Sequence, residues 1–100
     1  MNATLKEWFK GTNIQWIKFF EDPWLFYGEH QWQNVPYGVV LNMKDAEPYL
    51  NIAFDSGFGS QQVPNFNAWS EDTVYFVHEY DGSSSLASAE RFPYPEDKSI

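Results

Sequence analysis

The stretch TVYFVHEYDGSSSLASAE, residues 73–90, decides the fold of this chain. Its first eight residues are mostly β-branched or aromatic, which is typical of strands. The pair Asp81-Gly82 follows, and both residue types tolerate the positive φ angles of a two-residue hairpin turn. Ser83 to Glu90 then supplies a return strand, so we predict an antiparallel hairpin in which Val77 lies opposite Leu86.

Alternating side chains give the first strand of this hairpin two different faces. One face carries Thr73, Tyr75, Val77 and Glu79, and the other carries Val74, Phe76, His78 and Tyr80. Because both faces are half apolar, the pattern predicts a strand inside a sheet that an N-terminal helix covers on one side. The polar tip at residues 79–84 is predicted to be exposed.

The helix is predicted to begin after Thr4. Thr4 and Glu7 have the spacing of a capping box, in which each side chain bonds the other residue's backbone amide. One face of the helix is apolar, at Leu5, Trp8 and Phe9. Gly11 lies where a left-handed residue would end it.

The next segment, Asn13 to Phe20, fits neither the helical nor the strand period cleanly. Thr12 and Gln15 offer a second capping box, so we predict one or two further helical turns, which end before Pro23.

The remainder reads as strands separated by turn residues. We predict strands at Trp24 to Tyr27, Pro36 to Asn42 and Tyr49 to Asp55, and a long loop from Ser56 to Asn67. The expected fold class is α+β, with a short N-terminal helical segment packed on a mainly antiparallel β-sheet. Residues 1–100 are expected to form a single domain with an irregular tail at 93–100.

Composition predicts a folded cytoplasmic protein. Aromatic residues make up 20% of the 100 residues, enough to fill a small core despite the net charge of −8. Cysteine is absent, which favours a reducing compartment. No apolar run approaches the length of a membrane span, and the first ten residues do not resemble a signal peptide, so we expect a mature, soluble chain.

Charge is unevenly distributed along the sequence. Between Lys44 and Arg91 there is no lysine or arginine, but there are eight acids, Asp45, Glu47, Asp55, Glu71, Asp72, Glu79, Asp81 and Glu90. A surface built from this stretch repels nucleic acid and anionic membranes, and it attracts basic proteins or metal ions. We therefore expect neither nucleic acid nor membrane as a partner.

A metal site would need the two histidines, His30 and His78, together with Asp55 or Asp81. His78 and its neighbour Glu79 point to opposite faces of the predicted strand, and nothing in the sequence brings His30 near His78. We expect surface or hydrogen-bonded histidines and no bound metal.

Enzyme motifs give no better candidate. The serines at 83–85 adjoin a turn and lack the G-x-S-x-G pattern of an activated nucleophile. The glycines at 57 and 59 lack the lysine and following helix of a phosphate-binding loop. Glu71 and Asp72 are adjacent acids before a strand, which favours a solvated loop over acid-base catalysis. We expect no enzymatic activity and no cofactor.

Acids interspersed with aromatic residues are the remaining functional feature. They are Tyr49, Asp55, Phe58, Phe66, Trp69, Glu71, Asp72, Glu79, Tyr80 and Asp81. Aromatic anchors supply buried area while carboxylates attract and pair with basic groups, so the combination suits capture of a basic protein. An ordinary acidic surface over an aromatic core would give the same pattern. The predicted partner-binding residues are Asp55, Trp69, Glu71, Asp72, Glu79, Tyr80 and Asp81.

In size, charge, aromatic content and lack of cysteine, the chain resembles bacterial toxin-immunity proteins, such as those of contact-dependent growth inhibition. The resemblance implies that the chain binds a cognate, basic toxin domain, often a nuclease, and occludes its active site. It also implies that acids at 71, 72, 79 and 81 take the place of phosphates, with Trp69 and Tyr80 as buried anchors.

Two other interpretations remain open. A phage-encoded inhibitor that mimics DNA would carry acids spaced like phosphates along one face. A small carbohydrate-binding or metal-dependent enzyme domain would instead have a concave pocket with converging acids, or with His30 near His78.

Overall fold

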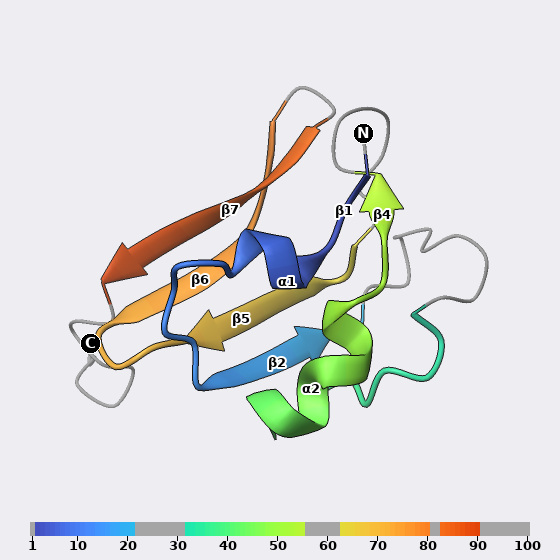
Figure 1. Ribbon diagram of the computed structural model, residues 1–100, viewed down its shortest axis with the longest axis horizontal. Coiled ribbons are helices and arrows are strands. Elements are labelled where there is room, and N and C mark those ends of the chain that lie inside the picture. Colours follow the sequence, from blue (N-terminus) through green and yellow to red (C-terminus); the bar gives the residue numbers. More distant parts are fainter. Residues whose placement is uncertain (1, 22–31, 56–62, 81–82, 91–100) are drawn as a thin grey trace.

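The chain has an α+β fold in which two short helices lie on a five-stranded antiparallel sheet (Figure 1). This computed structural model describes residues 2–21, 32–55, 63–80 and 83–90, with only the backbone described at Asp55 and Tyr80. The sheet order is β3-β2-β5-β6-β7. The strands of this sheet are β2 (Trp16–Phe20), β3 (Val40–Asn42), β5 (Asn65–Trp69), β6 (Thr73–Tyr80) and β7 (Ser83–Glu90).

The predicted hairpin is confirmed. Strands β6 and β7 pair antiparallel over their full lengths, with Val77 opposite Leu86 and Tyr80 opposite Ser83. β6 lies inside the sheet, between β5 and β7, as its two half-apolar faces predicted. The local turn sequence was therefore sufficient to set the register.

The predicted N-terminal helix is also confirmed, as α1 (Leu5–Trp8). The Glu7 amide donates to Thr4 Oγ1, and the Thr4 amide donates to Glu7 Oε1, each at 3.1 Å. Gly11 has a φ of +83°, the left-handed conformation expected after this helix. Leu5 and Phe9 are buried on the sheet side, and the Phe9 ring meets Phe66 of β5 edge to face at 5.6 Å.

The helical turns predicted for Asn13 to Phe20 are wrong, because this segment contains strand β2. Ile17 and Phe19 are buried while Lys18 and Phe20, which face the other way, are only half-buried. β2 lies between β3 and β5, and pairing with both of them overrides the weak helical signal. The Thr12 hydroxyl, predicted to cap a second helix, instead donates to the carbonyl oxygen of Phe9, at the end of α1.

A second helix, α2 (Met43–Leu50), was not predicted, and it takes up the first two residues of the predicted strand Tyr49 to Asp55. Only Val40–Asn42 of the predicted strand Pro36 to Asn42 is extended, and Tyr49 to Asp55 contributes only β4 (Phe54–Asp55). Asn42 starts the helix, because its side-chain oxygen accepts from the Asp45 amide at 2.7 Å. Burial of Ala46 and Leu50, one turn apart, fixes the helix against the core.

We expect Asn42→Ala to lower the free energy of unfolding by about 1 kcal/mol, because it removes this cap. Asn42→Asp should retain most of the stability, since aspartate accepts the same hydrogen bond. Urea unfolding of the two variants and the parent chain measures the difference. Equal losses in both variants would mean that the cap contributes little.

The remaining predictions on local structure divide into three groups. The long loop predicted for Ser56 to Asn67 is wrong at its end, because β5 begins at Asn65; residues 56–62 lie outside the described residues. The strand predicted at Trp24 to Tyr27 and the tail at 93–100 also lie outside them. A short strand that the sequence did not indicate, β1 (Asn2–Ala3), pairs antiparallel with β4 in a separate two-stranded sheet.

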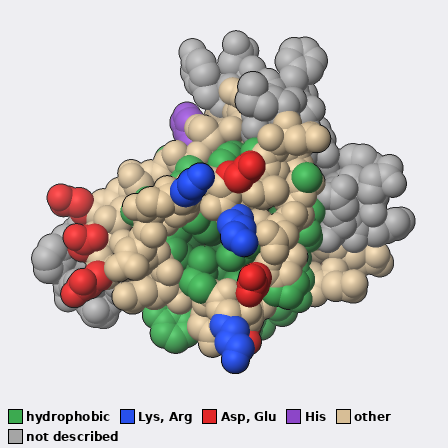
Figure 2. All heavy atoms as spheres, viewed as in Figure 1, with side chains coloured by type: hydrophobic (Ala, Val, Ile, Leu, Met, Phe, Trp, Pro, Cys, Tyr) green, Lys and Arg blue, Asp and Glu red, His purple; other side chains and the backbone are tan. Residues whose placement is uncertain are grey.

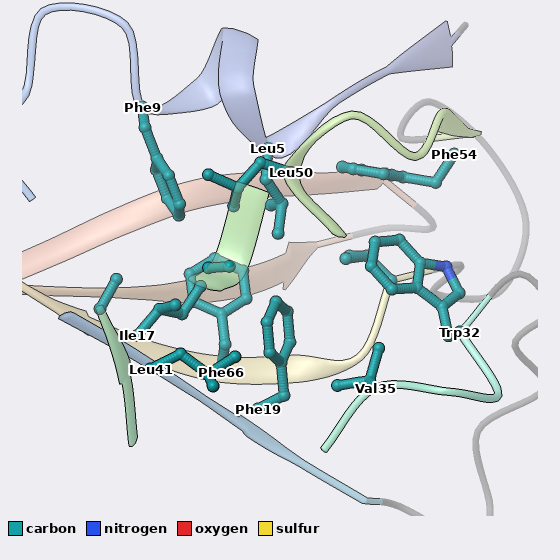
Figure 3. Packing of buried hydrophobic residues seen from close by; sticks show 13 residues of the cluster. Leu5, Phe9, Ile17, Phe19, Trp32, Val35, Leu41, Leu50, Phe54 and Phe66 are labelled. Carbon is teal, nitrogen blue, oxygen red and sulfur yellow. The ribbon is translucent and has the colours of Figure 1, made fainter. Parts of the chain in front are cut away.

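Aromatic rings fill the core between the helices and the sheet (Figure 3). Phe19 of β2 is completely buried, and its ring lies 6.1 to 6.3 Å from those of Trp32, Tyr49 and Phe66. Trp32 is also fully buried and lies 6.3 Å from Phe54. These contacts join β2, β4, β5, α2 and the segment around Trp32 into one cluster.

The five-stranded sheet therefore has a core face and an outer face. Both helices lie on the core face, which carries Ile17 and Phe19 (Figure 1). No described helix or strand covers the outer face, which carries Trp16, Trp69 and Phe76 on adjacent strands.

Candidate functional site

The turn between β5 and β6 presents two adjacent carboxylates. Glu71 and Asp72 are its central residues, and both are exposed. The Ser70 amide donates to the carbonyl oxygen of Thr73 at 2.9 Å, which closes the turn. The Thr73 hydroxyl donates to Asp72 Oδ1 at 3.0 Å, which helps to orient that carboxylate.

Strand pairing brings a third acid to the same place. Glu90, the last residue of β7, lies opposite Thr73, directly after the turn. We call Glu71, Asp72 and Glu90 the acidic end of the sheet. Figure 2 shows acidic side chains gathered at the left edge of the molecule, where β7 ends and β5 leads into β6 in Figure 1.

Tryptophan side chains adjoin the acidic end on the outer face of the sheet. Trp69 is the last residue of β5, two positions before Glu71, and is half-buried. Trp16 of β2 is its cross-strand partner and is 47% exposed. On the side of β5 away from β2, Val74 of β6 lies opposite Trp69 and extends this apolar row to a third strand.

The structure thus brings together three of the predicted partner-binding residues, Trp69, Glu71 and Asp72. It adds Trp16 and Glu90, which sequence reasoning did not assign to the site. The hairpin register contained the signal for Glu90, because a chain that turns at 81–82 must place Glu90 opposite Thr73. No signal identified Trp16, since its segment was assigned to a helix.

Other predicted site residues lie at the far end of β6. Glu79 is exposed and lies opposite Ser84, and the backbone of Tyr80 pairs with Ser83. Glu79 lies six positions after Thr73 along the antiparallel strand, which corresponds to about 20 Å. Asp81 lies outside the described residues. The tip and the acidic end therefore form two separate acidic positions rather than one continuous patch.

Asp55 belongs to neither position. It ends β4 and pairs through its backbone with Asn2 of β1, in the two-stranded sheet. Phe66, one of the aromatic residues considered as part of a binding surface, is instead in the core: it is only 1% exposed and packs against Phe9 and Phe19. Tyr49 is half-buried on α2, and Phe58 lies outside the described residues.

Basic side chains lie away from the acidic end. Lys6 belongs to α1 and Lys44 to α2, on the helical side of the molecule, and Figure 2 shows blue side chains over that region. Lys18 lies on the outer face of β2, 5.4 Å from the centre of the Phe20 ring. The helical side carries both lysines and acids, as Figure 2 shows, whereas the charged residues described at the acidic end are acids alone.

Within the ranges that the structure describes, no group of three His, Asp or Glu side chains could hold a metal ion. His78 is exposed on β6, and strand alternation places it and Glu79 on opposite faces, as predicted. His30 lies outside these ranges.

No family model, no curated protein and no solved structure matches the chain. Among the described residues, no helix is long and apolar enough to cross a membrane.

Proposed function

We propose that this chain is a cytoplasmic immunity protein that binds a basic toxin domain, most simply a nuclease, and occludes its active site. The observation that carries the proposal is the acidic end itself. Glu71 and Asp72 of the β5-β6 turn and Glu90 at the end of β7 lie together at one end of the sheet. Trp16 and Trp69 lie next to the turn on the outer face, whereas Glu90, opposite Thr73, faces the core side.

The carboxylates and the tryptophan rings would contribute differently to binding. Exposed carboxylates of one sign attract a basic partner over a distance of about 10 Å at moderate ionic strength and then pair with its Lys or Arg groups. Trp16 supplies apolar area that a partner can bury, which gives affinity that charge alone does not provide. In a nuclease, the groups that these carboxylates would engage are those that otherwise bind phosphate.

The DNA-mimic alternative is less well supported by the described strands. It requires acids at regular, phosphate-like spacing along one face. Glu79 and Glu90 share a face of the β6-β7 hairpin, but they lie about 20 Å apart along it, and the strand residues between them carry no acid. Glu71, Asp72 and Glu90 instead lie together at one end of the sheet.

The direct test uses the protein domain encoded immediately upstream of the gene for this chain. This domain is purified and titrated with the chain in a calorimeter. We expect a one-to-one complex, loss of the domain's toxic activity at that ratio, and a dissociation constant that rises as salt is increased. A domain that does not bind, or that remains fully active when bound, would contradict the proposal.

Binding of a soluble carbohydrate is a second candidate, favoured by the placement of Trp16 opposite Trp69 on an open sheet face. Flat rings on a flat surface can stack on the apolar faces of sugar rings. Titration of tryptophan fluorescence with soluble polysaccharides tests this, with Trp16→Ala as the comparison. Saturable binding that Trp16→Ala abolishes would favour this function over the immunity function.

A further inference from the structure

Within the described part of the chain, strand β7 is an edge strand that lacks lysine, proline and bulges. The sheet order ends at β7, so among the described strands it has a neighbour, β6, on one side only. Natural proteins protect such edges with lysine, proline, bulges or short strands, because an edge offers amide and carbonyl groups to another chain. β7 is eight residues long, has no Lys or Pro, and pairs with β6 residue for residue without a bulge.

The opposite edge of the sheet is different. β3 has only three residues, and the chain passes directly from it into α2 at Met43. A partner strand would find few backbone groups there, so the two edges are not equivalent as binding positions.

Small side chains make the β7 edge accessible. Six of its eight residues are Ser or Ala, and Ser85, Ser88 and Ala89 are exposed. In an antiparallel ladder, every second residue of an edge strand directs its amide and carbonyl groups away from its one neighbour. Residues 85–90 thus present a row of main-chain donors and acceptors flanked mainly by small side chains, whereas Ser84 is buried.

Acidic side chains near both ends of β7 determine which kind of segment could pair with it. Glu90 belongs to β7 and lies beside Asp72, while Glu79 lies opposite Ser84 toward the other end of β7. An added strand would run past acids at both of its ends, which favours a segment that carries Lys or Arg. A second copy of the chain is disfavoured, because antiparallel pairing of two β7 strands would bring the Glu90 end of one copy to the Glu79 end of the other.

We propose that β7 takes up an extended, basic segment of a partner protein as a sixth strand of the sheet. The inference rests on the proposed function in one respect, namely that the partner is basic. Main-chain pairing supplies the affinity and the acids at both ends set the preference for charge, as in other cases of strand addition.

The test uses synthetic peptides and the full chain. An eight-residue peptide of alternating Lys and Val should bind at least about 10-fold more tightly than a Glu-Val peptide of the same length, measured by fluorescence anisotropy. A third peptide keeps the Lys-Val sequence but carries N-methyl groups on two successive central residues, which blocks both of its hydrogen-bonding edges. It should bind at least about 10-fold more weakly than the unmodified peptide.

Amide hydrogen exchange locates the peptide on the chain. Alternate amides within residues 85–90 should exchange rapidly in the free chain and slow at least about 10-fold when the Lys-Val peptide is bound. Three results would overturn the proposal. They are equal binding of the methylated peptide, protection of every β7 amide in the free monomer, and protection that grows with chain concentration, which would identify a second copy as the occupant.

The toxin domain separates this inference from the proposed function. Saturating Lys-Val peptide should raise the apparent dissociation constant of the toxin domain at least about 10-fold, through competition. Toxin binding that is unaffected by the bound peptide would overturn the β7 proposal and leave the immunity function intact. Tight binding of the Lys-Val peptide to β7, together with no binding of the toxin domain, would support the β7 proposal and overturn the immunity function.

Discussion

Replacing Phe19 with alanine is expected to lower the free energy of unfolding by about 3 to 5 kcal/mol. Phe19 is 0% exposed, and its ring contacts those of Trp32, Tyr49 and Phe66. The alanine variant loses the transfer free energy of the ring and leaves a cavity at the centre of the core. Because domains of this size are stable by only about 5 to 15 kcal/mol, a large part of the total stability is at stake.

The neighbouring residue provides a matched control. Phe20 has the same side chain but lies on the outer face of β2, where it is half-buried and contacts Lys18. We expect Phe20→Ala to cost about 1 kcal/mol, mainly through partial loss of burial and of the cation-π contact. Denaturant unfolding of both variants measures the difference. Equal costs would contradict the alternation of buried and half-buried residues in β2, and with it the assignment of this segment to a strand.

Local signals were sufficient for the elements whose contacts are close in sequence. The β6-β7 hairpin depends on strand pairs that begin only three residues apart in sequence, at Tyr80 and Ser83. Helix α1 depends on two hydrogen bonds between Thr4 and Glu7. In both cases the groups that stabilise the element lie within it, so the sequence predicted it correctly.

Elements stabilised by distant partners were missed. β2 is a strand because Ile17 lies between Leu41 and Ala68 in the sheet, and neither partner is near it in sequence. The same capping-box pattern that predicted α1 correctly was misleading at Thr12, because the hydroxyl of Thr12 bonds to the end of α1. Pro48 inside α2 is a further case, since a proline in a segment this short argues against a helix unless packing compensates.

The candidate site was only partly predictable for a related reason. Sequence proximity correctly grouped Trp69, Glu71 and Asp72, which lie around one turn. The predicted partner-binding set also included Glu79, but the length of β6 places Glu79 about 20 Å away. Membership of the site is decided by strand register, which brings Glu90 to the turn and Trp16 opposite Trp69.

Reversing the three charges of the acidic end is expected to weaken binding of the toxin domain about 1,000-fold or more. Close charge pairs across a measured protein interface couple by about 1.5 to 7 kcal/mol, so loss of two or three pairs is sufficient, and the new lysines also repel a basic partner. The variant is Glu71→Lys, Asp72→Lys and Glu90→Lys. All three positions are exposed, so the fold should tolerate the change.

Two control variants distinguish the effect of the acidic end on binding from the effects of net charge and of the hairpin tip. Glu21→Lys, Asp45→Lys and Glu47→Lys reverse three exposed acids elsewhere, from the same starting net charge of −8, and should weaken binding less than about 10-fold. Glu79→Lys tests the far end of β6. Calorimetry at low and at physiological salt measures all three variants, and the salt dependence should decrease most in the acidic-end variant. If the control triple weakened binding as much as the acidic-end triple, long-range attraction by net charge would explain the affinity, and the acidic end would not be the binding site.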